Sequence, residues 1–167
     1  MIKDIDQSWV DFLKESESEK GSLCEVNRPI IIVAASGQRC ADIMRETKSF
    51  KEDEKKGMTA KLFAKHFKLA EQIERLKKGW KHSNIPLSAY DNIISGKLLF
   101  GVGTPSRIQK LMEAGVLNPQ SVFLDYNYRN KKRQRLIDEK EVKKQLAEFF
   151  GAFVETQKQT DTKLFIF

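Results

Sequence analysis

Four short apolar runs, separated by segments with helical spacing, constrain the fold more than any other feature of this sequence. The runs are residues 29–35, 97–102, 121–125 and 163–167. Each run is continuously apolar rather than alternating, which is typical of strands covered on both faces of a parallel sheet. We therefore expect an α/β fold: a parallel β-sheet with helices on both faces, joined by right-handed crossovers.

The segments between the runs carry helix signals. Residues 59–78 give the strongest pattern, because their apolar residues recur at spacings of three and four. Further helices are expected over residues 40–49, 90–95 and 138–156. Thr104 followed by Pro105 is typical of a helix start, and Gly115 of a helix end. The stripe expected on the helix over 59–78 is Leu62, His66, Leu69, Ile73, Leu76 and Trp80.

Length and composition exclude several classes of protein. A chain of 167 residues fits one domain, so we expect residues 1–167 to fold as a single unit. No apolar run approaches the roughly 18 residues that a membrane span requires, and residues 1–20 lack the basic start and apolar core of a signal peptide, so we do not expect secretion. Cys24 and Cys40 form no Cys-x-x-Cys pair, which favours a reducing compartment inside the cell.

The positive charge is concentrated in the second part of the chain. The net charge is +7, and residues 58–167 hold 20 basic and 11 acidic residues. Such asymmetry favours a polyanionic partner, most often nucleic acid, because each phosphate contact releases counterions. The alternative is a solvated surface without a partner.

Two loops that follow apolar runs are candidate phosphate sites. The first contains Ser36, Gly37 and Arg39, and the second contains Gly103, Thr104, Ser106 and Arg107. Ligands of parallel sheets bind beyond the carboxyl ends of the strands, where free amides, hydroxyls and guanidinium groups can hold a phosphate. The alternative is an ordinary helix cap. The second loop is not a dinucleotide fingerprint, because the third glycine is missing.

A basic run follows the third strand. Its cationic residues are Arg129, Lys131, Lys132, Arg133 and Arg135. Tyr126 and Tyr128 precede them and could stack on unpaired bases, or pack beneath the loop. The run itself could instead be a solvated turn or a localisation signal.

Enzymatic and metal chemistry find little support in the sequence. It contains no G-x-x-x-x-G-K-[ST] loop and no G-x-S-x-G elbow, and His66 and His82 lie far from clustered ligands. We expect no catalytic residue, no metal and no cofactor. Asp125 ends a strand, where a carboxylate could serve residual nucleotide binding with a partner's loop.

In order, these pieces resemble the first RecA-like domain of DEAD-box RNA helicases. The loop at Ser36 stands where that family has Pro-Thr-Arg-Glu, and residues 104–107 resemble Thr-Pro-Gly-Arg with Ser106 replacing the glycine. Asp125 falls where Asp-Glu-Ala-Asp belongs, with Tyr126 at the glutamate position. The resemblance implies a degenerate RecA-like domain that holds an RNA backbone with these loops and lacks ATPase activity.

A narrower resemblance is to the Cms-type family of small-subunit ribosome-biogenesis proteins. It rests on residues 61–72, on GTPSRIQKL and on LDYNYRNKKRQRLID, and covers about residues 29–150. Residues 1–27 carry none of it and form a divergent N-terminal segment. The resemblance implies a non-catalytic RNA-binding assembly factor in the nucleolus. Its implied partners are pre-rRNA or small nucleolar RNA, and protein components of the small-subunit processome. The alternative function is a protein-docking module that does not bind RNA directly.

Overall fold

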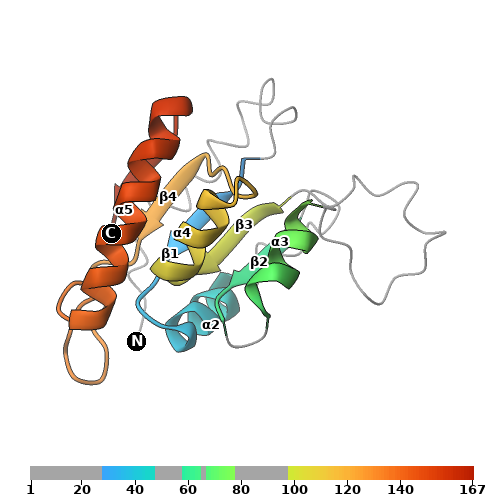
Figure 1. Cartoon of the computed structure of the whole chain (residues 1–167). Coiled ribbons are helices and arrows are strands. Elements are labelled where there is room, and N and C mark those ends of the chain that lie inside the picture. The colour runs from blue at the N-terminus through green and yellow to red at the C-terminus, as the bar shows by residue number, and fades with distance from the viewer. Residues whose placement is uncertain (1–27, 48–57, 65–66, 78–97) are drawn as a thin grey trace, which may run out of the picture.

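The computed structural model describes residues 28–47, 58–64, 67–77 and 98–167 (Figure 1). Within them, strands and helices alternate along the chain. In order, they are β1 (Ile30–Val33), α2 (Gly37–Glu46), β2 (Met58–Leu62), α3 (Leu69–Lys77), β3 (Leu98–Gly103), α4 (Pro105–Glu113), β4 (Ser121–Leu124), α5 (Lys140–Gln159) and β5 (Lys163–Ile166).

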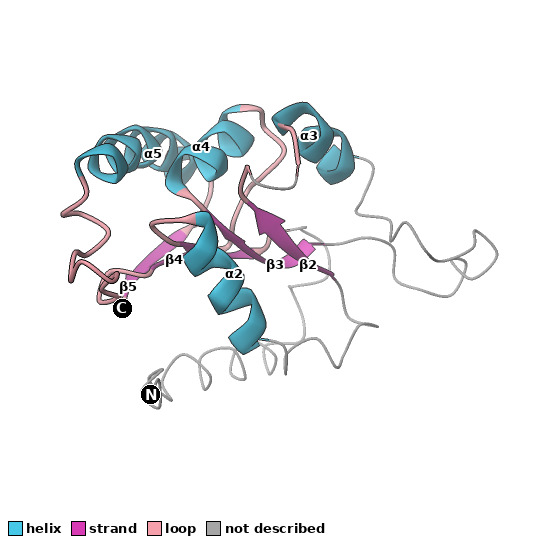
Figure 2. Cartoon of the chain, turned by 90° about the horizontal axis from the view of Figure 1, so that it is seen from below, coloured by secondary structure: helices cyan, strands magenta, loops and turns pink. Residues whose placement is uncertain are grey.

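The strands form one parallel sheet in the order β2-β3-β1-β4-β5. Figure 2 shows α3, α4 and α5 on one side of the sheet and α2 on the other. The expected α/β architecture, with a parallel sheet and helices on both faces, is therefore confirmed. This arrangement fits a RecA-like fold.

All four expected strands are present, but the helix expected over 59–78 was wrong in its first half. Met58–Leu62 is instead the strand β2, and the helix α3 begins only at Leu69. The cause is tertiary: β2 pairs with β3, and Gly101 and Gly103 leave room for Leu62 across the ladder. Leu69 and Ile73 keep their expected place on the apolar face of α3, whereas His66 and Trp80 lie outside the described residues.

The other helices agree with the sequence patterns to within a few residues. Helix α2 begins at Gly37, three residues before the expected start, because the Ser36 hydroxyl accepts a hydrogen bond from the Arg39 amide (3.2 Å). Helix α4 has Thr104 before it and Pro105 in its first turn, and Gly115 after it has a φ of 66°. The helix expected over 90–95 lies outside the described residues.

The core has two layers, one on each face of the sheet. Ile31 and Val33 of β1 face α4 and α5, whereas Ile32 faces α2. This central strand is buried on both sides, as its continuous apolar sequence predicts. Edge strand β5 is different: Ile166 is 64% exposed, because no strand lies beyond β5 among the described residues. In the described part of the chain, no helix is long and apolar enough to cross a membrane.

Candidate nucleic-acid interface

The loops after β1, β3 and β4 meet at the carboxyl edge of the sheet. The Ala34 amide donates to the Gly103 carbonyl (3.0 Å), and the Asp125 amide donates to the Val33 carbonyl (3.0 Å). The chain leaves β1 through α2 on one face, and leaves β3 and β4 through α4 and α5 on the other. This reversal beside β1 is the position where open α/β sheets bind ligands.

An internal ion pair fills that position. Arg39 Nε lies 2.7 Å from Asp125 Oδ2, and Arg39 Nη2 lies 3.1 Å from Oδ1. The two residues are 8% and 3% exposed, and the Arg39 guanidinium stacks 4.1 Å from the centre of the Tyr128 ring. Burial alone would lower the pKa of Arg39, but the hydrogen bond and charge of Asp125 outweigh it and raise that pKa. A phosphate contact by Arg39 would require breaking this pair.

Arg107 is held differently, by neutral acceptors. Its Nη1 donates to the Phe67 carbonyl (3.1 Å) and to Gln72 Oε1 (2.8 Å). Gln72 is fully buried and is itself fixed by its Nε2, which donates to the Lys61 carbonyl (2.9 Å). Burial lowers the pKa of Arg107, and among the described residues no carboxylate pairs with it. A half-buried cation without a carboxylate is a suitable partner for an anion.

The start of α4 adds further groups beside Arg107. The Thr104 side chain makes no cap hydrogen bond, and Ser106 is half-buried in the first turn. The positive end of the helix dipole lies here as well. Gly103 is explained by packing instead, because an added Cβ would clash with the Leu62 carbonyl oxygen of β2.

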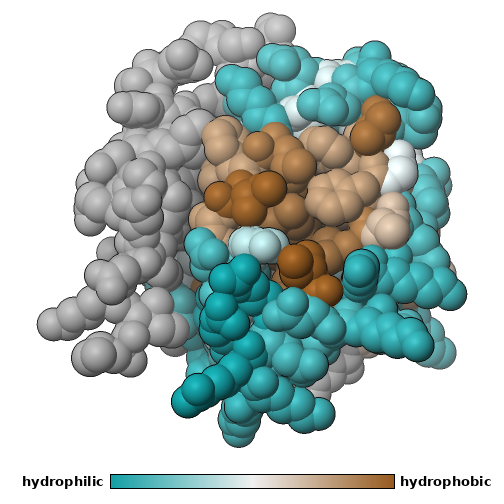
Figure 3. Space-filling view, turned by 90° about the vertical axis from the view of Figure 1, so that its left-hand side faces the viewer, coloured by the Kyte–Doolittle hydropathy of each residue, from teal (hydrophilic) through white to brown (hydrophobic). Residues whose placement is uncertain are grey.

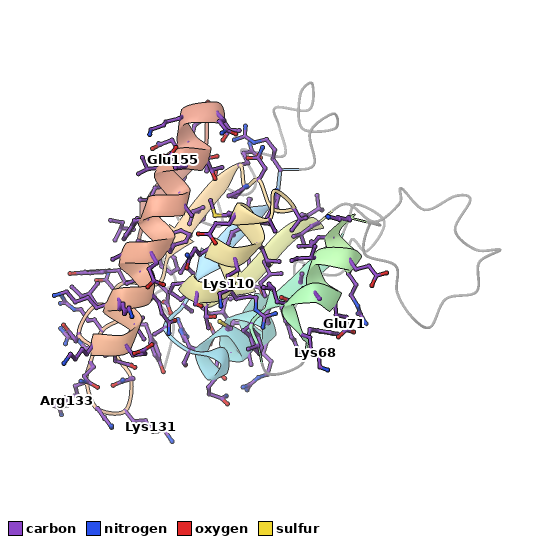
Figure 4. The ribbon with its side chains drawn as sticks, in the orientation of Figure 1. Lys68, Glu71, Lys110, Lys131, Arg133 and Glu155 are labelled. Carbon is purple, nitrogen blue, oxygen red and sulfur yellow. The ribbon has the colours of Figure 1, made fainter. Side chains whose placement is uncertain are left out.

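The charges around Arg107 are also positive. Lys68 precedes α3, directly after the residue whose carbonyl holds Arg107, and Lys110 follows Arg107 by three residues on α4 (Figure 4). Both lysines are exposed. The nearby acid Glu71 is bound to Arg75 (3.0 Å). The potential at this end of the sheet therefore favours an anion.

The loop 129–135 is a second basic surface, organised by Asn130. Its Oδ1 accepts from the amides of Lys132 (2.8 Å) and Gln134 (3.0 Å), and its Nδ2 donates to Glu139 (2.7 Å). Arg133 has a φ of 59°, which turns the chain back. No sequence signal pointed to Asn130, apart from the general tendency of asparagine to form such turns.

The basic side chains of this loop divide into two groups. Lys131, Lys132 and Arg133 are exposed, and Figure 4 shows Lys131 and Arg133 extending from the outer end of the loop. Arg129, also exposed, donates to the Arg133 carbonyl (3.1 Å). Arg135 is half-buried and stacks 5.3 Å from the centre of the Tyr126 ring.

The contacts of the two tyrosines favour the packing interpretation over base stacking. Tyr126 lies against Arg135, and Tyr128 lies against Arg39. Both rings are half-buried. The tyrosines therefore connect the basic loop to the carboxyl edge of the sheet.

The described residues give little support to a metal site or a nucleophilic cysteine. No three His, Cys, Asp or Glu side chains among them come together as a metal-ligand group. Burial and the charge of Asp125 raise the pKa of the buried Cys40 thiol to about 12. A thiol with that pKa is a poor nucleophile at neutral pH.

The fold and its edge define a class: a parallel α/β domain whose ligand position is closed by an ion pair and flanked by basic residues. Comparison with known families gives the particular family. Residues 4–166 match the model of the CMS1 family, described as U3-containing 90S pre-ribosomal complex subunit, and the chain belongs to this family. The resemblance to the Cms-type proteins is thereby confirmed. The match also reaches well into the first 27 residues, which carried none of the motifs.

Individual proteins with the same family name are similar to the chain over most of its length. The chain is 33% identical to human Protein CMSS1 over 150 residues, which is 88% of this chain and 44% of that protein. It is 32% identical to Protein CMS1 of Chaetomium thermophilum over 161 residues, covering 91% and 56% of the two chains. For Protein CMSS1 of Xenopus laevis the identity is 30% over 154 residues, covering 90% and 46%. The chain thus spans about half the length of these relatives.

Proposed function

We propose that this chain binds RNA without catalysing a reaction, as an assembly factor of the 90S pre-ribosomal particle in the nucleolus. The family description supports the particle and, through it, the nucleolus and partners among the particle's proteins. The RNA would be pre-rRNA or an associated small nucleolar RNA. The RNA contact is supported by the chain's own residues at the carboxyl edge.

The observation that most supports an RNA contact is the environment of the Arg107 guanidinium. Its charge is partly desolvated, is held by neutral acceptors and lies beside the positive end of α4. This arrangement is unfavourable for a cation alone and becomes favourable when a phosphate binds. Thr104 and Ser106 hydroxyls would complete the contact. Lys131, Lys132 and Arg133 would add affinity without sequence preference, because phosphate contacts position a protein but do not read bases.

Two candidate residues have other roles in the structure. Arg39 is occupied by Asp125, and the Ser36 hydroxyl caps α2. We therefore leave both out of the set of phosphate contacts. The same ion pair supports the non-catalytic part of the proposal, because it neutralises Asp125, the one buried carboxylate among the described residues of this edge that a metal-bound nucleotide could use.

The test is a fluorescence anisotropy titration of single-stranded and duplex RNA at several salt concentrations. Arg107→Ala should weaken binding and lower the slope of log affinity against log salt by about one unit. Replacing Lys131, Lys132 and Arg133 together with alanine should lower the slope by about three units.

The matched control is Arg45→Ala. Arg45 is an exposed arginine in the last turn of α2, so this variant changes the net charge equally but away from the carboxyl edge. It should leave the slope unchanged. Equal affinities and slopes for wild type and Arg107→Ala would refute the phosphate contact by Arg107.

A protein-docking function is the second candidate. Figure 3 shows a hydrophobic patch, bordered by hydrophilic residues, on the side of the molecule where α5 lies. Val154 of α5 and Ile166 of β5 are among the exposed large hydrophobic residues. A docking module would bind protein components of the particle through this side and would bind isolated RNA weakly, with no effect of Arg107→Ala.

A further inference from the structure

The fully buried side chain of Gln72 connects the strand β2 to Arg107. Gln72 Nε2 donates to the Lys61 carbonyl of β2 (2.9 Å), and Gln72 Oε1 accepts from Arg107 Nη1 (2.8 Å). The direction of both hydrogen bonds is fixed by chemistry, because a carbonyl oxygen only accepts and a guanidinium group only donates. Gln72 therefore sets the position of the Arg107 guanidinium relative to the sheet.

The contacts of Arg107 leave one edge of its guanidinium group without a partner. Nη1 also donates to the Phe67 carbonyl (3.1 Å), so both of the Nη1 hydrogens are used. Within the described part of the chain, no group accepts a hydrogen bond from Arg107 Nε or Nη2. Neither of these atoms is fully buried, so a ligand can reach the edge that they form.

Arg39 shows what the same edge of an arginine binds when a carboxylate is present. Arg39 Nε and Nη2 both donate to Asp125, at 2.7 and 3.1 Å. Such pairs of parallel hydrogen bonds are the way in which arginine binds a carboxylate or a phosphate in a bidentate contact. Arg107 has the same place in α4 as Arg39 has in α2, three residues after the N-cap. The edge is therefore filled in Arg39 and open in Arg107.

Gln72 holds Arg107 without neutralising it. A glutamate at this position would accept the same hydrogen bond from Nη1, but its negative charge would pair with the guanidinium group as Asp125 pairs with Arg39. An ionised glutamate would also have no donor for the Lys61 carbonyl. The amide group thus fixes the guanidinium group and leaves its charge for a ligand.

We propose that Gln72 is a positioning residue, which orients the Nε–Nη2 edge of Arg107 for a bidentate contact with a backbone phosphate of RNA. This inference rests on the proposed RNA contact of Arg107. The two non-bridging oxygens of a phosphodiester match the two donors of this edge. The contact fixes the RNA backbone and reads no base.

The test is the salt dependence of oligouridine binding by Gln72→Glu, measured by fluorescence anisotropy beside wild type. Because the new carboxylate neutralises Arg107, we expect the affinity to fall about tenfold and the slope of log affinity against log salt to fall by about one unit. The matched control is Gln159→Glu, which adds the same charge at an exposed position at the end of α5, close in sequence to the amino end of β5. This control should leave the slope unchanged.

Arg107→Ala in the same titration separates the two proposals. If Arg107→Ala lowers the slope and a folded Gln72→Glu does not, the RNA contact of Arg107 stands and the positioning role of Gln72 is refuted. If neither variant lowers the slope, the RNA contact itself is wrong.

A measurement on the unaltered chain covers the case in which Gln72→Glu does not fold. In ¹⁵N NMR spectra, the Gln72 side-chain amide should exchange slowly with water both with and without oligouridine. The Arg107 Nε–H signal should shift and exchange several-fold more slowly when oligouridine is bound. An Nε–H signal that oligouridine does not change would overturn the bidentate contact, and fast exchange of the Gln72 amide in the complex would overturn the positioning role.

Discussion

Breaking the ion pair between Arg39 and Asp125 should destabilise the domain strongly. Asp125→Ala leaves a buried guanidinium with no hydrogen-bonded carboxylate, since Arg39 is 8% exposed and both of its bonds to Asp125 are lost. Only the Glu46 carboxylate remains near Arg39, at 3.9 Å. Removing one partner of such a pair costs about 3–5 kcal/mol. That is a large fraction of the roughly 5–15 kcal/mol by which domains are stable, so the melting temperature should fall by about 10 °C.

The assay is urea unfolding followed by circular dichroism, with two comparison variants. Arg45→Ala breaks the exposed pair of Arg45 with Asp42 and should cost at most about 1 kcal/mol. The double variant Arg39→Met with Asp125→Leu removes both charges and should recover most of the stability lost in Asp125→Ala. A loss below about 1 kcal/mol in Asp125→Ala, or a double variant no more stable than the single one, would refute the reasoning.

Two further predictions concern packing and the buried thiol. Gly103→Ala places a Cβ against the backbone of Leu62 and should lower stability by about 1–3 kcal/mol. Gly151→Ala lies inside α5, where the added Cβ meets no atom within 4 Å, and should raise stability by about 0.5–1 kcal/mol. Urea midpoints that rank the two variants the other way would contradict the packing argument. In a Cys24→Ser variant at neutral pH, Cys40 should hold about 10³-fold less thiolate than an unperturbed cysteine, because its pKa is raised to about 12. Reaction with a thiol reagent should therefore follow unfolding, and fast labelling of the native protein would be inconsistent with this burial. The same shift means that ionisation of the unfolded thiol should lower stability as the pH rises from about 9 toward 12.

Much of the architecture could be predicted from local patterns. The four apolar runs became strands, and Thr104, Pro105 and Gly115 marked the ends of α4 as expected. These signals are local, because caps and fixed backbone angles act within a few residues. The missed strand β2 shows the limit of such patterns. Leu62 fits the helical stripe of residues 59–78, and only pairing with β3 assigns it to a strand.

The candidate site shows the same division between what local patterns predict and what strand pairing adds. Local patterns in the sequence are enough to predict that two arginines, Arg39 and Arg107, follow strands of a parallel sheet and begin helices. The different partners of the two guanidinium groups depend on the tertiary structure. Strand β4 pairs with β1 and brings Asp125 to Arg39, whereas β2 lies beside β3 and brings Gln72 and the Phe67 carbonyl to Arg107. Strand order is set by how all the strands pack together, so it is not encoded near either arginine. The strand order neutralises the charge of Arg39 and leaves the charge of Arg107 available for an anion.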